Sequence, residues 1–170
     1  MGVSYSKTNR TIVFSSDIDK DTAQEFVMCV LEVLSEDVGG EVRIVINSGG
    51  GCLYGANLMI RYINLLKEKL TVVTEAVGEI ASSAFAVWLS GTRKEIFEGT
   101  TFELHGFTLS NPPSTIVDRE ASSKKLQHIS QFVSQIVARE TTIPYGEIQY
   151  IHSHYDSRVY SADEMRELLR

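Results

Sequence analysis

The most constraining feature of this sequence is a strand-like run that leads directly into three consecutive glycines. Residues 42–46 are rich in β-branched side chains, which favour a buried strand. Asn47 and Ser48 follow, then Gly49, Gly50 and Gly51. Apolar residues at helical spacing come next, namely Leu58, Met59, Tyr62, Ile63 and Leu66. A strand, a tight turn and a helix in this order predict the first half of a crossover between parallel strands.

The same arrangement recurs further along the chain. Residues 70–77 read as a second strand, and Gly78 separates them from a helix of small residues at about 81–89. Two short strands are predicted at 94–97 and 101–104, and another at 12–14. A helix follows the strand at 12–14, with Thr22 and Glu25 in the pattern of a capping box. This alternation predicts an α/β fold with right-handed crossovers.

The C-terminal part is predicted to be largely helical. A long helix is expected over residues 117–140, with an apolar stripe of Leu126, Ile129, Val133 and Ile136. A shorter helix is expected at 145–152, and another begins at about Ser161. Because no repeat, linker or low-complexity tract interrupts the sequence, residues 1–170 are predicted to form a single domain.

Composition excludes several classes of function. Hydrophobic residues make up 43% of the 170 residues and charged residues 22%, which is typical of a globular protein. The net charge of −6 argues against nucleic acid as a ligand, because phosphate binding needs clustered cations. No apolar run is long enough for a membrane span or a secretory signal. Two cysteines without metal-ligand spacing predict neither a disulfide framework nor a metal site, so we expect a cytoplasmic protein without a cofactor.

Three segments that could carry chemistry are predicted to meet at the carboxyl ends of the strands. The glycines at 49–51 can present bare N–H groups to a ligand, although they could equally form only a tight turn. Ser82 and Ser83 stand at a strand-to-helix turn, where a serine is either a nucleophile or a helix cap. His105 follows a strand and is either a general base or a structural histidine. Together they favour a catalytic site.

Four motifs in order resemble those of the ClpP-like serine peptidases, the proteolytic subunits of the Clp protease. The motifs are Val45-Ile46-Asn47-Ser48-Gly49-Gly50-Gly51, Gly78-Glu79-Ile80-Ala81-Ser82-Ser83, Thr101-Phe102-Glu103-Leu104-His105 and Tyr160-Ser161-Ala162-Asp163-Glu164. The resemblance extends from about residue 10 to residue 164. It implies a ClpP/crotonase-like fold of stacked β/α crossovers, from which the helix at about 117–140 protrudes as a handle.

The resemblance also implies roles for individual residues. Ser82 would be the nucleophile and His105 its general base, with the N–H groups of Gly51 and Ser83 as the oxyanion hole and Gly50 shaping the turn. The third member of the triad stays open. The position of the family's aspartate falls on Ser157, and Asp156 stands immediately before it. A Ser/Lys dyad with Lys125 is a less favoured alternative, because Lys125 falls on the handle helix.

At the level of assembly, the resemblance implies an oligomer of heptameric rings, paired through the handle helices. Such a chamber would hydrolyse protein or peptide substrates, held near the site by the segment after His105 through residues 110–113, and a Clp-type ATPase is a candidate partner. Two alternatives remain from the sequence alone. One is a catalytically weak or inactive ring subunit, and the other is a crotonase-like acyl-thioester enzyme that uses the glycine N–H groups for an enolate.

Overall fold

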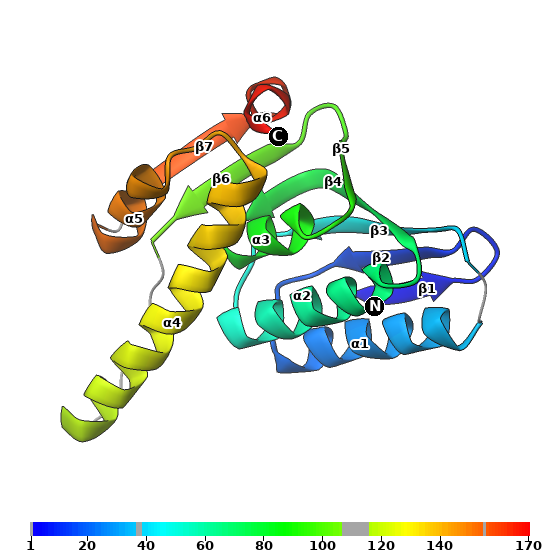
Figure 1. Cartoon of the computed structure of the whole chain (residues 1–170), viewed down its shortest axis with the longest axis horizontal. Coiled ribbons are helices and arrows are strands. Elements are labelled where there is room, and N and C mark those ends of the chain that lie inside the picture. The colour runs from blue at the N-terminus through cyan, green and yellow to red at the C-terminus, as the bar shows by residue number, and fades with distance from the viewer. Residues whose placement is uncertain (1, 37–38, 107–115, 155) are drawn as a thin grey trace.

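The computed structural model describes residues 2–36, 39–106, 116–154 and 156–170, without the side chains of 116–122 and 126 (Figure 1). Its strands are β1 (Val3–Ser6), β2 (Thr11–Ser15), β3 (Glu41–Ser48), β4 (Thr71–Ala81), β5 (Arg93–Ile96), β6 (Thr101–His105) and β7 (Ser157–Ser161). Its helices are α1 (Lys20–Ser35), α2 (Leu53–Lys67), α3 (Ser83–Leu89), α4 (Ile116–Glu140), α5 (Tyr145–His154) and α6 (Ala162–Leu168). The predicted α/β class is confirmed.

One mostly parallel sheet organises the molecule. The strand order is β1-β2-β3-β4-β6-β7, and β5 also pairs with β4. Strands β2, β3, β4 and β6 run parallel, whereas β1 and β7 are antiparallel to their neighbours. The first half of β4 pairs with β5 and its last three residues pair with β6. The ends of β4 and β6 therefore lie next to each other.

Helices α1, α2 and α3 cover one face of this sheet (Figure 1). Val42, Ile44 and Ile46 alternate along β3 and are fully buried. Burying each such side chain contributes about 1.5 to 3 kcal/mol relative to leaving it exposed, so the predicted strand is held by its apolar face. Phe85 of α3 packs edge-on against Phe102 of β6, with 5.9 Å between their ring centroids. This contact joins α3 to β6.

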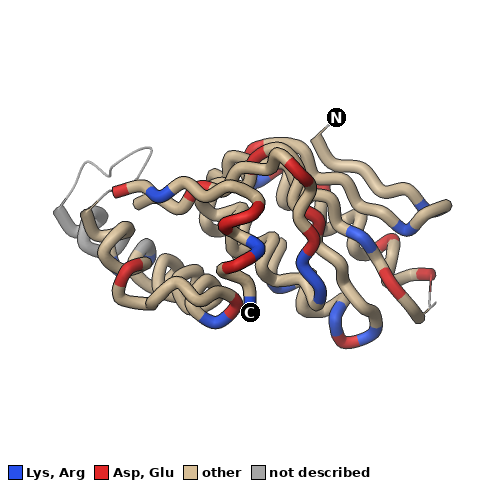
Figure 2. Tube along the Cα trace, turned by 90° about the horizontal axis from the view of Figure 1, so that it is seen from above, with Lys and Arg blue, Asp and Glu red and all other residues tan. Residues whose placement is uncertain are grey.

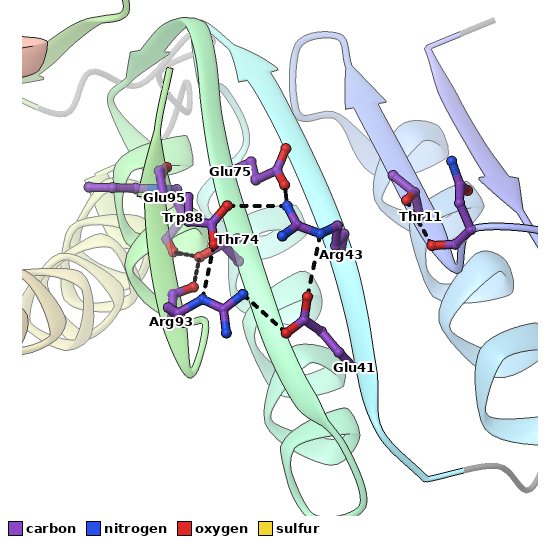
Figure 3. A network of polar contacts seen from close by, with 9 residues as sticks. Thr11, Glu41, Arg43, Thr74, Glu75, Trp88, Arg93 and Glu95 are labelled. Carbon is purple, nitrogen blue, oxygen red and sulfur yellow. Dashed lines mark hydrogen bonds and ion pairs between the residues drawn. The ribbon is translucent and has the colours of Figure 1, made fainter. Parts of the chain in front are cut away.

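The opposite face of the sheet carries a network of charged residues (Figure 3). Arg43 of β3 forms ion pairs with Glu75 of β4 and with Glu95 of β5, the latter at 3.1 Å. Arg93 pairs with Glu41 at 3.1 Å and with Glu95 at 2.9 Å. Opposite charges thus join three neighbouring strands, which stabilises their lateral order.

Helix α4 projects away from the body of the molecule (Figure 1). Its C-terminal half is anchored, since Val133 and Ile136 are buried, whereas Lys124, Lys125 and His128 are exposed. The predicted long helix is confirmed, and of its predicted stripe only Leu126 lies outside the described side chains. Acidic and basic residues are interspersed along the trace (Figure 2). None of the helices in the described ranges is long and apolar enough to cross a membrane.

Two local predictions are wrong, and two strands were not predicted. The N-cap of α1 is Asp19 and not Thr22, because Asp19 accepts the N–H of Thr22 while the Thr22 hydroxyl accepts the N–H of Asp19. Strand β4 continues past Gly78 to Ala81, because Gly78 can adopt a φ of 73° beside Asn47 and the Asn47 side chain then accepts the N–H of Glu79. The edge strands β1 and β7 lack an alternating apolar pattern long enough to predict them.

Candidate functional site

Ser82 occupies a strained turn between β4 and α3. It is the N-cap of α3, with a φ of 53° and a ψ of −127°, a combination that non-glycine residues rarely adopt. The residue is 7% exposed, and its side chain makes no capping hydrogen bond. Its N–H donates to the carbonyl of Glu103 at 2.9 Å, which joins the turn to β6. Such strain costs about 1 to 3 kcal/mol, so the surrounding structure holds the hydroxyl in place.

The glycine turn after β3 lies directly against this serine. Gly50 and Gly51 have φ values of 90° and 133°, which favour glycine. A Cβ atom at Gly50 would lie 2.7 Å from Cβ of Ser82 and 3.0 Å from the nitrogen of Ser83. Ile18 holds the turn on its other side, donating to the Gly50 carbonyl at 2.7 Å. The two motifs are therefore packed as one unit.

Two N–H groups at this turn are available to a ligand. Within the described ranges, neither the N–H of Gly51 nor that of Ser83 donates a hydrogen bond to the protein. The Ser83 hydroxyl donates to the carbonyl of Gly51 at 3.3 Å, which ties the two residues together. Paired N–H groups at the start of a helix favour negative charge, although α3 is short.

His105 ends β6, next to the end of β4. Ala81 of β4 is paired in register with Glu103 of the parallel strand β6. Ser82 comes one residue after Ala81, and His105 comes two residues after Glu103. The Nδ1 atom of His105 lies 2.8 Å from the carbonyl oxygen of Gly106. The hydrogen bonds of the described residues do not include one between the Ser82 hydroxyl and the His105 ring. The fold thus brings the two residues to one edge without joining them directly.

The two candidates for the third position lie at the start of β7. Ser157 is paired in register with His105. The carboxylate of Asp156 accepts from the N–H of Ser157 at 2.9 Å and from Arg158 at 2.7 Å, and these bonds lower the pKa of Asp156. Asp156 touches the β6 end through its backbone, since its carbonyl accepts the N–H of Gly106 at 3.2 Å. Its carboxylate is therefore directed to its own strand.

Two residues near His105 were not singled out from the sequence. Glu103 accepts a hydrogen bond from the Ser157 hydroxyl at 2.7 Å, and the alternation along β6 would have placed it on the same face as His105. His152 on α5 contacts the Ser134 hydroxyl of α4 at 3.0 Å. Burial, together with the charge of nearby His105, lowers the pKa of His152 to about 4. No motif in the sequence indicated His152.

Other predicted residues are not brought to this edge. Lys125 is exposed on the projecting half of α4. The segment predicted to hold substrate includes residues 107–113, which lie outside the described residues. Within the described ranges, no three histidine, cysteine, aspartate or glutamate residues cluster closely enough to hold a metal ion.

Fold and site together define an α/β protein with a serine on a strained strand-to-helix turn, the arrangement in which hydrolases present a nucleophile. The family model described as Clp protease matches residues 3–166, so the chain belongs to the Clp protease family. The chain is also similar to the ATP-dependent Clp protease proteolytic subunit 2 of Borreliella burgdorferi. The two are 26% identical over 135 residues, which covers 78% of this chain and 67% of that protein. Family membership supports a ClpP-like peptidase and confirms the resemblance seen in the sequence.

Proposed function

We propose that this protein is a serine endopeptidase that hydrolyses peptide bonds of unfolded proteins or peptides inside an oligomeric chamber. Ser82 is the nucleophile and His105 the general base. The observation that carries the proposal is the strained backbone of Ser82, with its φ of 53°, packed against Gly50. A fold retains such strain where the position of the side chain matters.

The hydrolytic steps use groups that lie at one edge of the sheet. The Ser82 hydroxyl oxygen attacks the peptide carbonyl, and Nε2 of His105 takes its proton. A hydrogen bond from Nδ1 to the Gly106 carbonyl, across the observed 2.8 Å, leaves Nε2 without a proton and able to accept one. His105 then protonates the leaving amine, and water releases the acyl group from Ser82.

The negative charge that develops on the carbonyl oxygen needs donors fixed in advance. The N–H groups of Gly51 and Ser83 are suited to this role, because each is held by backbone contacts and donates to no group of the described chain. Loss of one such donor reduces the rate by about 100- to 1000-fold. Gly50 supports the pair by allowing the turn to approach Ser82.

We also propose a homo-oligomer of paired heptameric rings joined through α4. The projecting half of α4 supports this assembly, because it extends beyond the body of the molecule (Figure 1) and its described residues Lys124, Lys125 and His128 are exposed. The relative from Borreliella burgdorferi is named as a subunit of an ATP-dependent protease. A Clp-type ATPase that delivers unfolded chains is therefore the proposed partner. Native mass spectrometry tests the assembly, and a stable monomer would contradict it.

A fluorophosphonate probe tests the nucleophile directly. We expect labelling of the intact protein at Ser82, identified by peptide mapping, and complete loss of labelling in Ser82→Ala. Ser153→Ala is the matched control, because Ser153 is exposed on α5 and its hydroxyl bonds to Tyr150 and His154 of the same helix. Labelling should be accompanied by cleavage of fluorogenic peptides.

The second candidate function is a ring subunit without catalysis. It is favoured by one observation, namely that the Asp156 carboxylate is bound by Arg158 rather than by His105. A folded oligomer that neither reacts with the probe nor cleaves peptides would support this candidate against the first.

A further inference from the structure

The chain places a carboxylate beside His105 that does not belong to Asp156. Phe102 and Leu104 of β6 are buried, so Glu103 and His105 alternate with them and lie on the opposite face of the strand. Side chains two residues apart on one face of a strand are neighbours. Glu103 is therefore adjacent to His105 along β6.

Strand β7 adds a hydroxyl between these two residues. Ser157 lies opposite His105 in the antiparallel ladder. Gly106 donates its N–H to the carbonyl of Asp156, so these two residues form a hydrogen-bonded pair. The neighbouring pair of His105 and Ser157 is therefore a non-hydrogen-bonded pair. In such a pair the two side chains lie closest to each other. The Ser157 hydroxyl donates to Oε1 of Glu103 at 2.7 Å. Glu103, Ser157 and His105 are thus contiguous on one surface.

The two nearby carboxylates differ in their partners. Asp156 is engaged by the guanidinium of Arg158 at 2.7 Å, which offsets its charge. Within the described part of the chain, Glu103 has no cationic partner, and its bond from Ser157 leaves its charge in place. On α5, His152 lies near His105, and its low pKa of about 4 keeps it neutral at neutral pH, whereas His154 acts on Asp156. Glu103 is therefore a negative charge on the same strand face as His105 that no described cation offsets.

We propose that Glu103, held by Ser157, is the positioning residue that stabilises the protonated form of His105. The inference rests on the proposed role of His105 as general base. The Nδ1 proton stays on His105, directed at the Gly106 carbonyl, and no proton passes to Glu103. Ser157 and Glu103 together take the place of an aspartate at position 157 that would contact the imidazole directly.

The titration of the His105 ring measures this effect without any need for activity. Its NMR signals, assigned with His105→Gln among the four histidines of the chain, give a titration midpoint. Glu103→Gln removes the charge but keeps an amide oxygen to accept the Ser157 hydroxyl, so a merely structural hydrogen bond is preserved. We expect the midpoint to fall by about half a pH unit to one pH unit, because a nearby anion favours the imidazolium.

Glu167→Gln is the matched control, because Glu167 is exposed on α6, which follows the far end of β7. It should leave the midpoint unchanged. If the His105 midpoint were unchanged in Glu103→Gln, the proposal would be overturned. It would also be overturned if the midpoint fell in Asp156→Asn but not in Glu103→Gln. Labelling of Ser82 is measured separately, so loss of the proposed function and loss of this inference are distinguishable.

The pH dependence of peptide cleavage is a second readout. In Glu103→Gln the acid limb of the kcat/KM profile should move to lower pH. The plateau value of kcat/KM should fall by about 10-fold, because the imidazolium is less stabilised in the transition state. Ser157→Ala should move the limb in the same direction by releasing Glu103 from its position. A uniform fall without a shift of the limb would indicate a structural role and contradict the proposal.

Discussion

Gly50 lies so close to Ser82 that no residue larger than glycine fits at position 50. A Cβ atom at position 50 would lie 2.7 Å from Cβ of Ser82 and 2.6 Å from the carbonyl oxygen of Ala81. Both neighbours are fixed, one by the strained turn and the other by β4. The glycine turn and the serine turn therefore cannot move independently, and a change in one displaces the other.

Substitution of Gly50 by alanine tests this coupling. Gly50→Ala should lower the free energy of unfolding by about 2 kcal/mol or more, because overpacking adds to the strain of a φ of 90°. Displacement of the adjacent N–H donors should also slow labelling of Ser82 by about 100-fold or more. Urea denaturation and the rate of probe labelling measure the two effects.

Gly99 offers a matched control for this variant. Its φ is 78°, but an added Cβ would meet nothing within 4 Å. Gly99→Ala should therefore lose stability through the backbone conformation alone, without a steric clash. The probe should label Ser82 of this variant at the normal rate. Equal losses in the two variants would contradict close packing of Gly50 against Ser82.

The backbone at Ser82 predicts an unusual order of stability. The φ of 53° and ψ of −127° match the first central residue of a type II′ turn, a position that favours glycine. Ser82→Gly should therefore be more stable than Ser82→Ala by about 1 kcal/mol, because glycine relieves the strain. Thermal or urea denaturation measures the difference, and neither variant should react with the probe.

The same pair of substitutions at Ser153 should give the reverse order. Ser153 lies within α5, where glycine is less favourable than alanine by about 1 kcal/mol. If Ser82→Ala proved more stable than Ser82→Gly, the strain at Ser82 would be absent in solution, and the main support for its role would be lost.

Much of the fold was predictable because its signals are local. The β-branched run before Gly49 became β3, and the apolar stripe after Cys52 became α2. The short strands β5 and β6 and the long helix α4 were also predicted from patterns within each segment. The presence of Ser82 and His105 at neighbouring strand ends followed from the order of these elements.

The parts that the sequence did not predict depend on contacts between distant segments. Strand β7 is an exposed edge, with Val159 66% exposed, so it lacks the apolar alternation that marks a half-buried strand. Without β7 there was no means of pairing Ser157 with His105 or of finding its bond to Glu103. The extension of β4 past Gly78 likewise depends on Asn47, whose side chain accepts the N–H of Glu79 at 3.1 Å.

The ion pair between Arg43 and Glu75 should contribute strongly to stability (Figure 3). Glu75 is only 7% exposed, so removal of its cation leaves a carboxylate that water reaches poorly. Arg43→Met should lower the free energy of unfolding by about 2 to 3 kcal/mol in urea denaturation. The double variant Arg43→Met/Glu75→Leu should recover most of this loss, because no charge is then left buried.

Arg93→Met provides the comparison from the same network. Arg93 is half exposed and pairs with Glu41 and Glu95, which water also reaches, so its removal should have a much smaller effect. If the double variant were no more stable than Arg43→Met, burial of the Glu75 charge would not be the cause of the loss.

The half-buried His152 predicts how stability changes with acid. Its pKa is lowered to about 4, chiefly by burial, whereas an unfolded histidine has a pKa of about 6.5. Between these values the unfolded chain binds the proton that the folded chain excludes, so stability rises with pH.

The free energy of unfolding should fall by about 2 kcal/mol from pH 7 to pH 4 on account of His152. In His152→Gln, which can still bond to Ser134, that part of the dependence should disappear in urea denaturation. His128→Gln, at an exposed position of α4, should retain it. Equal pH dependence in the wild type and both variants would contradict a His152 that is neutral in the folded protein.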